Sequence, residues 1–307
     1  MATLPNPDDE HEIEASRMTL GEHLEELRSR LFKSVIALVI VFSVVYTWRF
    51  EVFTMIQGPH QNAMVMLNEA RAEHYEGIIQ ERQAAGEEVD PGVWFSEGYP
   101  EVMVLNDEHR NDDRLVHFSA DQGFLLRLRI CFWVSMFISG PFLLLQMWGF
   151  IAAGLYRNEK SVVHSYLPAS LILFLGGVLF GYFVMVPYAL YFLGLDDLNL
   201  ETLGVGSQTA GSYLEFLKAL ALAMGAVFQL PVIMLALTKL DLVDAKLWPT
   251  YRRHTVIGAL VIAAVLTPPD PITQMLMAVP IVILYEAGVI LTRIAARKAA
   301  AAEQGLA

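Results

Sequence analysis

A run of charged side chains near the N-terminus is the strongest chemical signal in the sequence: His23-Leu24-Glu25-Glu26-Leu27-Arg28-Ser29-Arg30-Leu31. Glu26 and Arg30 are four residues apart with the acid first, the order that favours an ion pair on one helix face. Carboxylates can also accept planar guanidinium groups in a bidentate geometry. Two interpretations stay open: a solvated face with weak ion pairs, or a docking surface for a charged partner.

A second acid, Glu159, lies in the polar stretch Leu155-Tyr156-Arg157-Asn158-Glu159-Lys160. Taken alone, this stretch is an ordinary polar turn between two apolar segments. Its position becomes more informative beside Glu26, because the predicted topology puts both carboxylates at the same face of a membrane. Two carboxylates at one face suggest a receptor for arginine side chains.

Other polar side chains lie inside long apolar stretches, where they are costly and indicate either helix contacts or function. Gln229, beside Pro231, is the most central of them, while Gln274 and Glu286 lie closer to the C-terminus. A membrane glutamine usually bonds a neighbouring helix. Both the packing and the functional interpretation of Gln229 therefore remain.

Small and imino residues predict how the helices meet. Gly177 and Gly181 have the small-xxx-small spacing that allows two helices to approach closely. Pro187, Pro231 and Pro280 should each kink the helix that contains them.

Enzyme signatures are absent from the sequence. There is no Walker A run, and Gly204-Val205-Gly206 lacks the third glycine of a dinucleotide loop. His11-Glu12 has no second histidine four residues on, the eight histidines lack metal-ligand spacing, and the single cysteine, Cys131, cannot form an internal disulfide. The chain is therefore predicted to be no enzyme and to hold no metal or cofactor. No nucleic acid is predicted as a partner, although the net charge of −12 argues against one only weakly, because most of the acidic surplus lies in one loop.

The elements that position these residues are long apolar helices. Hydrophobic residues make up 55% of the chain and charged residues 18%, against about 25% charged in ordinary soluble domains. A helix needs about 20 apolar residues to cross the hydrocarbon core. We predict an all-α integral membrane protein with six spans: Phe32 to Trp48, Phe124 to Ala152, Tyr166 to Phe192, Phe216 to Leu237, Thr255 to Leu266, and Ile272 to Thr292.

Two of these regions need comment. Thr19 and Glu22 have capping-box spacing, and the leucines that follow recur at helical intervals, so an amphipathic helix is predicted to lie on the membrane surface before the first span. The fifth span is too short for a normal bilayer. Either the membrane thins there, or this segment and the next form a hairpin that dips in and returns.

Charge sets the predicted orientation. Lys and Arg gather in the segments before the first span, after the second, after the fourth and after the sixth, whereas the loop around Asp196, Asp197 and Glu201 has none. This positive-inside pattern puts both termini in the cytoplasm of a multi-pass protein of the cell (inner) membrane.

The predicted organisation has three parts. Residues 1–18 form a disordered cytoplasmic N-terminus, residues 19–294 the six-helix membrane domain, and residues 295–307 a cytoplasmic tail. Within the membrane domain, residues 61–115 form an inserted, charged exterior subdomain, in which Asn68 to Ala85 reads as a charged helix.

Four motifs in order carry a family resemblance: H-L-E-E-L-R-S-R-L near the N-terminus, G-F-I-A-A-G-L-Y-R-N-E-K after the second span, F-Q-L-P-V in the fourth span and L-T-P-P-D-P between the last two spans. The chain resembles TatC, the multispanning receptor subunit of the twin-arginine protein translocase, over about Thr19 to Pro59 and Val116 to Arg293. The resemblance implies six spans in a concave, glove-like arrangement with short fifth and sixth helices, which favours bilayer thinning over the hairpin.

The resemblance also implies a function and partners. A TatC protein binds the twin-arginine signal peptides of folded precursor proteins at the cytoplasmic face and recruits single-span TatA- and TatB-like partners. It works within a complex that also contains further copies of itself, and the proton-motive force drives export. No cofactor is implied.

The implied binding residues follow position by position. Glu26 and Arg28 match the E-L-R of the first motif and Glu159 matches the acid of the first cytoplasmic loop, so these three are expected to bind the signal peptide. Pro59 matches the proline after the first span and is expected to be structural. Nothing is carried over to residues 62–114, because relatives usually have a shorter and less charged segment there.

The implied partner-binding residues lie further along the chain. Gln229 occupies the fourth-span position where many relatives have Glu, and a neutral amide can bond a polar group but cannot pair as an anion. Thr267, Asp270 and Gln274 match the polar positions of the last exterior turn, where partner helices are expected to dock, with Asp270 in a structural role.

The alternative is a small-solute secondary transporter, which would also be polytopic and free of ATP motifs. A transporter predicts internal repeats and broken helices with charged groups near the midplane. No repeat relates the two halves of this sequence, and its prominent acids lie at the predicted cytoplasmic surface.

Overall fold

The computed structural model describes residues 20–86, 120–155, 157–196, 210–267 and 270–305, and every regular element in this part of the chain is helical. Five stretches are long and apolar enough to cross a membrane: Gly21–Thr47, Gly123–Ala153, Val163–Leu193, Gly211–Lys239 and Pro271–Lys298. The all-α, multispanning architecture is thereby confirmed. The predicted fifth span, Thr255 to Leu266, stays a prediction, because its helix of 15 residues is too short to qualify.

The first helix, α2 (Leu20–Thr47), is continuous for 28 residues. The prediction of a separate surface helix before the first span was wrong, because no proline, and no glycine after Gly21, interrupts the backbone hydrogen bonds. The predicted N-cap, Thr19, lies outside the described residues. Only 6% of the most apolar part of α2 is buried within the protein, so this helix lies at the edge of the assembly.

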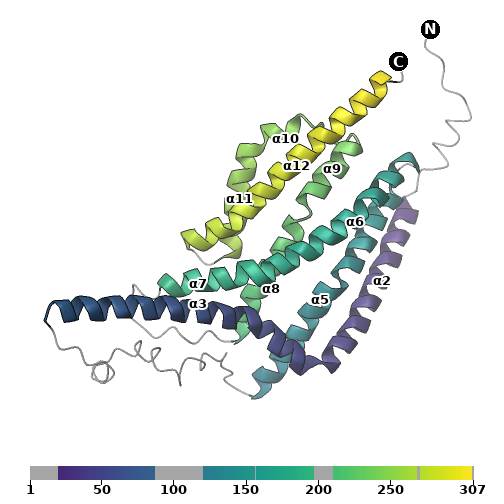
Figure 1. Ribbon diagram of the computed structural model, residues 1–307. Helices are drawn as coiled ribbons and strands as arrows, with labels where there is room; N and C mark the ends of the chain where they lie inside the picture. Colours follow the sequence, from purple (N-terminus) through teal and green to yellow (C-terminus); the bar gives the residue numbers. More distant parts are fainter. Residues whose placement is uncertain (1–19, 87–119, 156, 197–209, 268–269, 306–307) are drawn as a thin grey trace, which may run out of the picture.

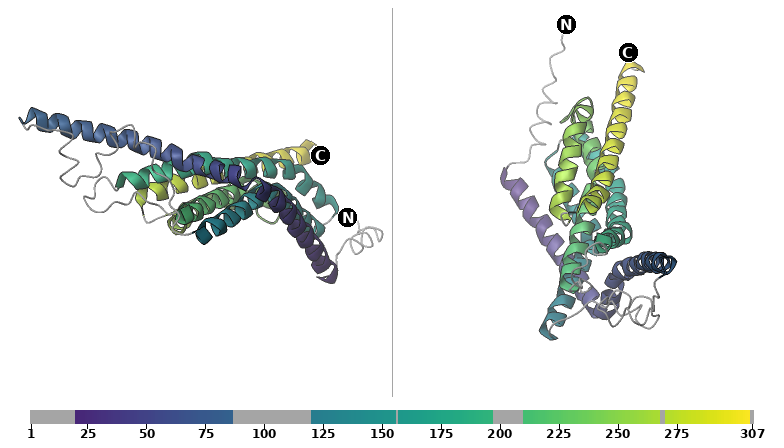
Figure 2. Two further views of the ribbon diagram at one scale, coloured as in Figure 1. Left: turned by 90° about the horizontal axis from the view of Figure 1, so that it is seen from below. Right: turned by 90° about the vertical axis from the view of Figure 1, so that its left-hand side faces the viewer.

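Helix α3 (Arg49–Ala84) follows at once and spans 36 residues, about 54 Å at 1.5 Å per residue. The charged helix predicted from Asn68 is its C-terminal half, so that prediction is confirmed and extended toward the N-terminus. Figures 1 and 2 show the distal part of α3 projecting well beyond the other helices. Residues 87–115 of the predicted exterior subdomain lie outside the described part.

Helix α5 (Ala120–Ala153) and the long helical segment after it run antiparallel to each other (Figure 1). Helix α5 leads through a short turn into α6 (Arg157–Phe180), a π-helical turn η2 (Gly181–Met185) and α7 (Val186–Asp196). Pro187 has no N–H to donate to the preceding turn, and the predicted distortion takes the form of this π turn, in which the Val186 N–H reaches the Gly181 carbonyl.

The remaining described helices belong to the C-terminal third of the chain. Helix α8 (Ala210–Val227) is separated from α9 (Leu230–Lys239) by a break at Phe228 and Gln229, immediately before Pro231. The break confirms the predicted effect of Pro231. A short helix, α10 (Leu247–Thr250), precedes α11 (Arg252–Leu266) and α12 (Pro271–Gly305).

Helix α11 is the predicted fifth span and has 15 residues, about 22 Å of helix. It packs along α12, which contains Pro280 and continues through most of the predicted tail. The length of α11 supports the expectation of a short fifth span.

Two glycines set the closest contact between helices. A Cβ atom on Gly177 would lie 2.6 Å from the Met224 carbonyl oxygen, and one on Gly181 would lie 2.9 Å from the Ala221 Cα. Both neighbours belong to the backbone of α8, which cannot move aside cheaply. The predicted small-xxx-small packing is confirmed, and it joins α6 and η2 to α8.

The helices form an open wall rather than a closed bundle. In Figure 1, α2 packs on α5, α5 on α6, and α6 on α8, while α9, α11 and α12 form the other side. The start of α2, the α5–α6 turn and the end of α12 lie toward one end of the molecule (Figures 1 and 2). The α2–α3 junction and the α11–α12 turn lie toward the opposite end.

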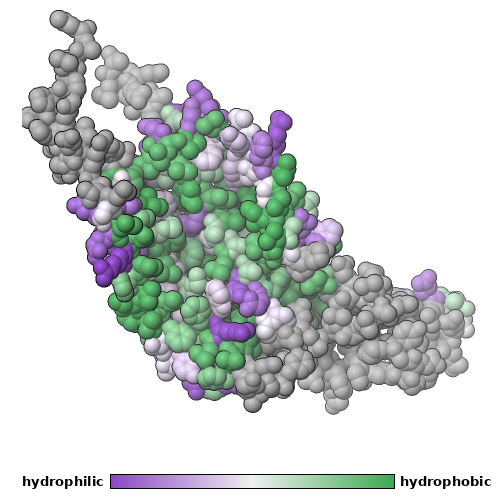
Figure 3. Space-filling model, turned by 180° about the vertical axis from the view of Figure 1, so that it is seen from behind, coloured by the Kyte–Doolittle hydropathy of each residue, from purple (hydrophilic) through white to green (hydrophobic). Residues whose placement is uncertain are grey.

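The outer surface suits a lipid environment. Figure 3 shows apolar side chains over much of the face turned toward the viewer. Ile172 is 69% exposed, Val265 78% and Ile283 61%, although such side chains are normally withdrawn from water. Since these residues lie on separate helices, the apolar surface is a property of the whole fold.

Candidate functional site

Glu26 and Arg30 form the best-defined charged site of the structure, on the first turns of α2. Glu26 Oε1 accepts a hydrogen bond from Arg30 Nε at 2.6 Å and forms an ion pair with Arg30 Nη2, also at 2.6 Å. The two side chains are 31% and 25% exposed, so the pair is partly shielded from solvent. Glu26 Oε2 has no hydrogen-bond partner among the described residues and is left to accept a further donor.

Helix α5 holds Arg30 in place. Arg30 Nη1 reaches Gln146 Oε1 at 3.5 Å, and a Cβ on Gly149 would lie only 2.0 Å from the same nitrogen. The missing side chain of Gly149 thus makes the notch that receives the guanidinium. Because this contact joins residues far apart in the chain, the sequence analysis did not identify Gln146 or Gly149.

His23 anchors the start of α2 beside this notch. Its ring stacks on Phe150 with centroids 4.4 Å apart, and a Cβ on Gly154 would lie 3.3 Å from the imidazole. His23 Nδ1 is buried without a hydrogen-bond partner in the described part of the chain. The stacking fixes the N-terminal end of α2 against the C-terminal end of α5. It thereby helps to orient Glu26, one turn further along α2.

Arg28 belongs to a more exposed neighbourhood. It pairs with Glu25 at 3.5 Å, with side chains 66% and 71% exposed, and its Cζ lies 5.8 Å from the Phe32 ring centroid. An ion pair this exposed contributes little to stability. The structure therefore separates the two bases of the run: Arg30 orients Glu26, while Arg28 neighbours Glu25.

Glu159 lies in the first turn of α6, just after the α5–α6 turn. The start of α6 lies at the same end of the molecule as the start of α2, to which Glu26 belongs (Figure 1). The geometry of the Glu159 side chain is outside the described part of the structure. The first turn of a helix favours negative charge, because unpaired backbone N–H groups give it a partial positive charge.

Gln229 is 5% exposed and is bonded inside the protein. Its Nε2 donates to the Ser170 carbonyl oxygen at 2.9 Å, and its Oε1 accepts a hydrogen bond from Ser170 Oγ. Trp148 Nε1 in turn donates to Ser170 Oγ at 2.9 Å. These three side chains, called the Gln229 network below, connect α5, α6 and the α8–α9 break.

The polar residues of the α11–α12 turn are also bonded locally. Asp270 Oδ2 accepts from the Thr273 N–H at 2.6 Å and so caps the start of α12. Thr267 Oγ donates to the Ala263 carbonyl at 2.9 Å, and Gln274 Nε2 donates to the Leu260 carbonyl at 3.0 Å. Thr267 and Asp270 are both 7% exposed, whereas Gln274 is half-buried.

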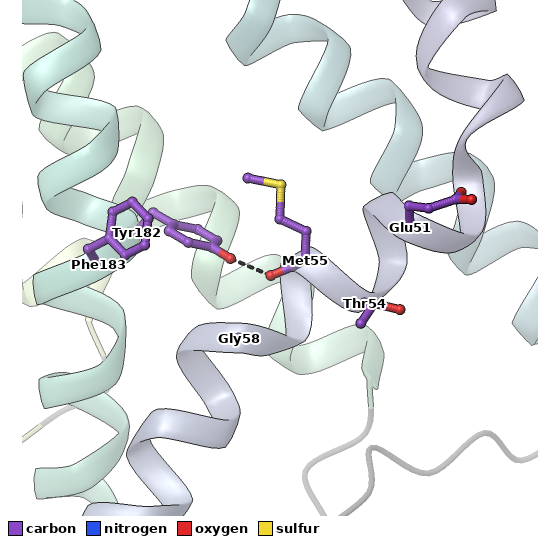
Figure 4. Close-up of a pocket in the computed structure, with 6 residues that line it drawn as sticks. All are labelled: Glu51, Thr54, Met55, Gly58, Tyr182 and Phe183. Atoms are coloured by element: carbon purple, nitrogen blue, oxygen red, sulfur yellow. Dashed lines mark hydrogen bonds between the residues drawn. The ribbon is translucent and has the colours of Figure 1, made fainter.

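A shallow groove of about 530 Å³ lies between α3 and η2. Figure 4 shows it lined by Glu51, Thr54, Met55, Gly58, Tyr182 and Phe183. Tyr182 donates to the Met55 carbonyl across its floor. The Tyr182 hydrogen bond holds this part of α3 against η2, and Pro59, the next residue of α3, is buried.

No group of three or more His, Cys, Asp and Glu side chains that could hold a metal ion is found among the described residues. The charged groups gathered at the start of α2 are suited to binding a charged ligand through ion pairs and hydrogen bonds. A carboxylate held by one arginine and open on its second oxygen can receive another guanidinium.

Comparisons with known proteins agree on one family. The family model for the Sec-independent protein translocase protein (TatC) matches residues 22–280. The chain is 32% identical over 274 residues to the TatC protein of Halothiobacillus neapolitanus, a match that covers 88% of this chain and 61% of that protein. It is also 32% identical over 215 residues to the TatCy protein of Bacillus subtilis, covering 67% of this chain and 83% of the relative.

A solved structure supports the same assignment. The crystal structure described as the twin-arginine translocase receptor TatC superposes with a TM-score of 0.63 and 28% sequence identity, over 90% of this chain and all of that one. Proteins of this family are components of a protein translocase and are not enzymes. With a family match across most of the chain and a shared fold, this multispanning membrane protein belongs to the TatC family of Sec-independent protein translocase proteins.

Proposed function

We propose that the chain is the receptor subunit of a twin-arginine translocase and binds the signal peptides of folded precursor proteins at its cytoplasmic face. The observation that carries the proposal is the Glu26 carboxylate, which Arg30 orients through one oxygen while the other has no partner among the described residues. An oriented, partly shielded carboxylate binds a guanidinium more strongly than a freely solvated one, since the binding site needs no reorganisation.

In this proposal Glu26 receives one arginine of the signal and Glu159 the other. Both acids belong to helix ends on the same side of the α2–α5–α6 wall. Arg28 keeps the acidic surface in register through its contact with Glu25. Two carboxylates are needed, because Arg30 already offsets the charge of Glu26.

Single-span TatA- and TatB-like subunits and further copies of this chain are the proposed partners, and the proton-motive force the proposed source of energy. A row of apolar side chains on α11 and α12 supports this: Ile257, Val261, Val265, Ile272, Met275, Val279 and Ile283 are all exposed. Thr267 and Gln274 lie at the turn that ends this surface. Gln229 acts from inside, because its hydrogen bonds to Ser170 hold the α8–α9 break against α6.

The experiment that tests the proposal is site-specific photocrosslinking in membrane vesicles. A photoreactive residue is placed beside the acids, at Leu27, which is 42% exposed, or at the half-buried Lys160, so that Glu26 and Glu159 stay intact. Precursors with a twin-arginine or a twin-lysine signal are then added. Both positions should crosslink the arginine form preferentially, because only guanidinium offers a bidentate donor pair. Leu24, 65% exposed and two residues from Glu26 on the helix, is the matched control and should not discriminate. Equal crosslinking of both signals from Leu27 and Lys160 would contradict the proposed site.

A further inference from the structure

Two arginines converge on one aromatic ring at the α2–α3 junction, far from the Glu26 site. Arg49 is the first residue of α3, and its Cζ lies 4.6 Å from the centroid of the Phe50 ring and 5.3 Å from that of Tyr46. Arg127, in α5, places its Cζ 5.4 Å from the same Phe50 ring. Two positive charges from different helices are thereby brought to one platform.

Neither arginine has an ion pair or hydrogen bond with an acidic side chain in the described part of the chain. The nearest acid along the chain, Glu51, lies two residues beyond Arg49, and side chains at that spacing do not face each other on a helix. Glu51 instead lines the groove on another face of α3 (Figure 4). The two like charges repel each other, so a bound anion would stabilise the arrangement.

The chemistry of the platform fits a phosphate group. A guanidinium that lies against an aromatic face uses its π surface and keeps its N–H edge for hydrogen bonds. Two such edges can bind the non-bridging oxygens of a phosphodiester in bidentate geometry. Tyr46 and Phe50 thus orient Arg49 without using its hydrogen-bond donors.

The surroundings indicate where such a phosphate comes from. Trp48, Phe50 and Phe124 are 57%, 56% and 55% exposed around the junction, at the end of two membrane-spanning stretches. Exposed aromatic rings at span ends are typical of the lipid headgroup level. An anion reaching both arginines there is in contact with the bilayer surface.

We propose that Arg49 and Arg127 bind the phosphodiester headgroup of an anionic phospholipid, with the Phe50 ring as their common platform. The site is distinct from the proposed signal-peptide site and does not depend on it. A lipid bound here bridges the α2–α3 junction to α5, and so fixes the point from which the long helix α3 departs.

Native mass spectrometry of the full-length protein in detergent tests the proposal, with phosphatidylglycerol and phosphatidylcholine of equal chain length added together. The wild type should retain phosphatidylglycerol preferentially, and R49Q/R127Q should reduce that preference by about tenfold or more, given two lost charge-assisted contacts. Arg129 is the matched control: it is exposed on α5 without a ring contact to Phe50, and R129Q should leave the preference unchanged.

Further arms separate the possible outcomes. Inorganic phosphate and glycerol phosphate at the same concentration should not displace the lipid; displacement by either would show a free-phosphate site and overturn the lipid assignment. Equal retention of both lipids by the wild type, or an equal loss of preference in R129Q, would also overturn it. If the double variant does not fold, R127Q alone should still lower the preference several-fold, and an unchanged preference there would refute the site.

Discussion

Glu26 shows how much of the site is decided by single side chains. Its ion pair with Arg30 follows from a spacing of four residues on one helix. Its orientation depends on Gly149, which leaves room for Arg30 on α5. The position of the carboxylate that is proposed to bind the signal peptide therefore depends on Gly149, a residue without a side chain.

Removing the carboxylate should weaken signal binding. We expect Glu26→Ala or Glu159→Ala to reduce the affinity for a twin-arginine signal peptide by about 1.5–3 kcal/mol, the range for hydrogen bonds to charged groups. Fluorescence anisotropy with a labelled peptide and protein in detergent measures the change. Glu25→Ala, which breaks an exposed pair, should cost no more than about 1 kcal/mol. Unchanged affinity in both Glu26→Ala and Glu159→Ala would contradict the assignment of these two acids to the signal-peptide site.

Gln229 should matter for stability. Gln229→Leu removes two hydrogen bonds to Ser170, and we expect the free energy of unfolding to fall by about 1–2 kcal/mol. Signal-peptide affinity should stay unchanged, because the Gln229 network does not include α2. Ser43→Ala is the control, since Ser43 is exposed and bonds only its own helix. Denaturant titration in detergent checks the prediction, and a variant as stable as the wild type would show that the network stabilises nothing.

The sequence predicted part of this residue-level picture. The pair of Glu26 with Arg30 could be predicted, because both residues belong to one helix. The partners Gln146, Gly149 and Phe150 could not, since they approach α2 only through the packing of α5. The internal bonding of Gln229 was one of two open interpretations, because a single sequence does not show which helix lies opposite.

At the scale of helices, the α6–α8 contact depends on two glycines. We expect Gly177→Ala or Gly181→Ala to lower the free energy of unfolding by about 1–3 kcal/mol, the usual cost of overpacking, because the new methyl group meets the backbone of α8. Gly176→Ala is the matched control, as a Cβ there meets nothing within 4 Å. Thermal unfolding in detergent compares the three, and equal melting temperatures would contradict the packing argument.

The helix boundaries show where sequence patterns are reliable and where they are not. The apolar stretches were predicted well, because their length is set by the bilayer. The surface helix was wrongly separated from the first span, since a change from amphipathic to apolar composition does not by itself end a helix. The full length of α3 was missed for the same reason: its composition changes along its length, but the helix continues, even past Pro59, which cannot donate a backbone hydrogen bond.

At the scale of the molecule, the span count depends on α11. In a Cys131→Ala background, a cysteine at Ile272, which is 47% exposed, should react with a membrane-impermeant maleimide added outside intact cells. Arg297→Cys should react only after the cells are opened, because both termini are predicted inside. Ile290→Cys, on the apolar surface of α12, should stay unlabelled. If Ile272→Cys is not labelled from outside, the six-span model is contradicted and a re-entrant hairpin is supported.

The Gln229 network also bears on how the chain is made. Trp148 and Ser170 are 22 residues apart, whereas Ser170 and Gln229 are 59 apart. At about 5–20 residues per second, the ribosome delivers Gln229 about 3–12 s after Ser170. During that interval the Gln229 acceptor of the Ser170 hydroxyl has not been made, so the packing of α5 on α6 lacks this hydrogen bond. Synthesis of the fourth apolar stretch then supplies Gln229 and completes the hydrogen bonds of Ser170.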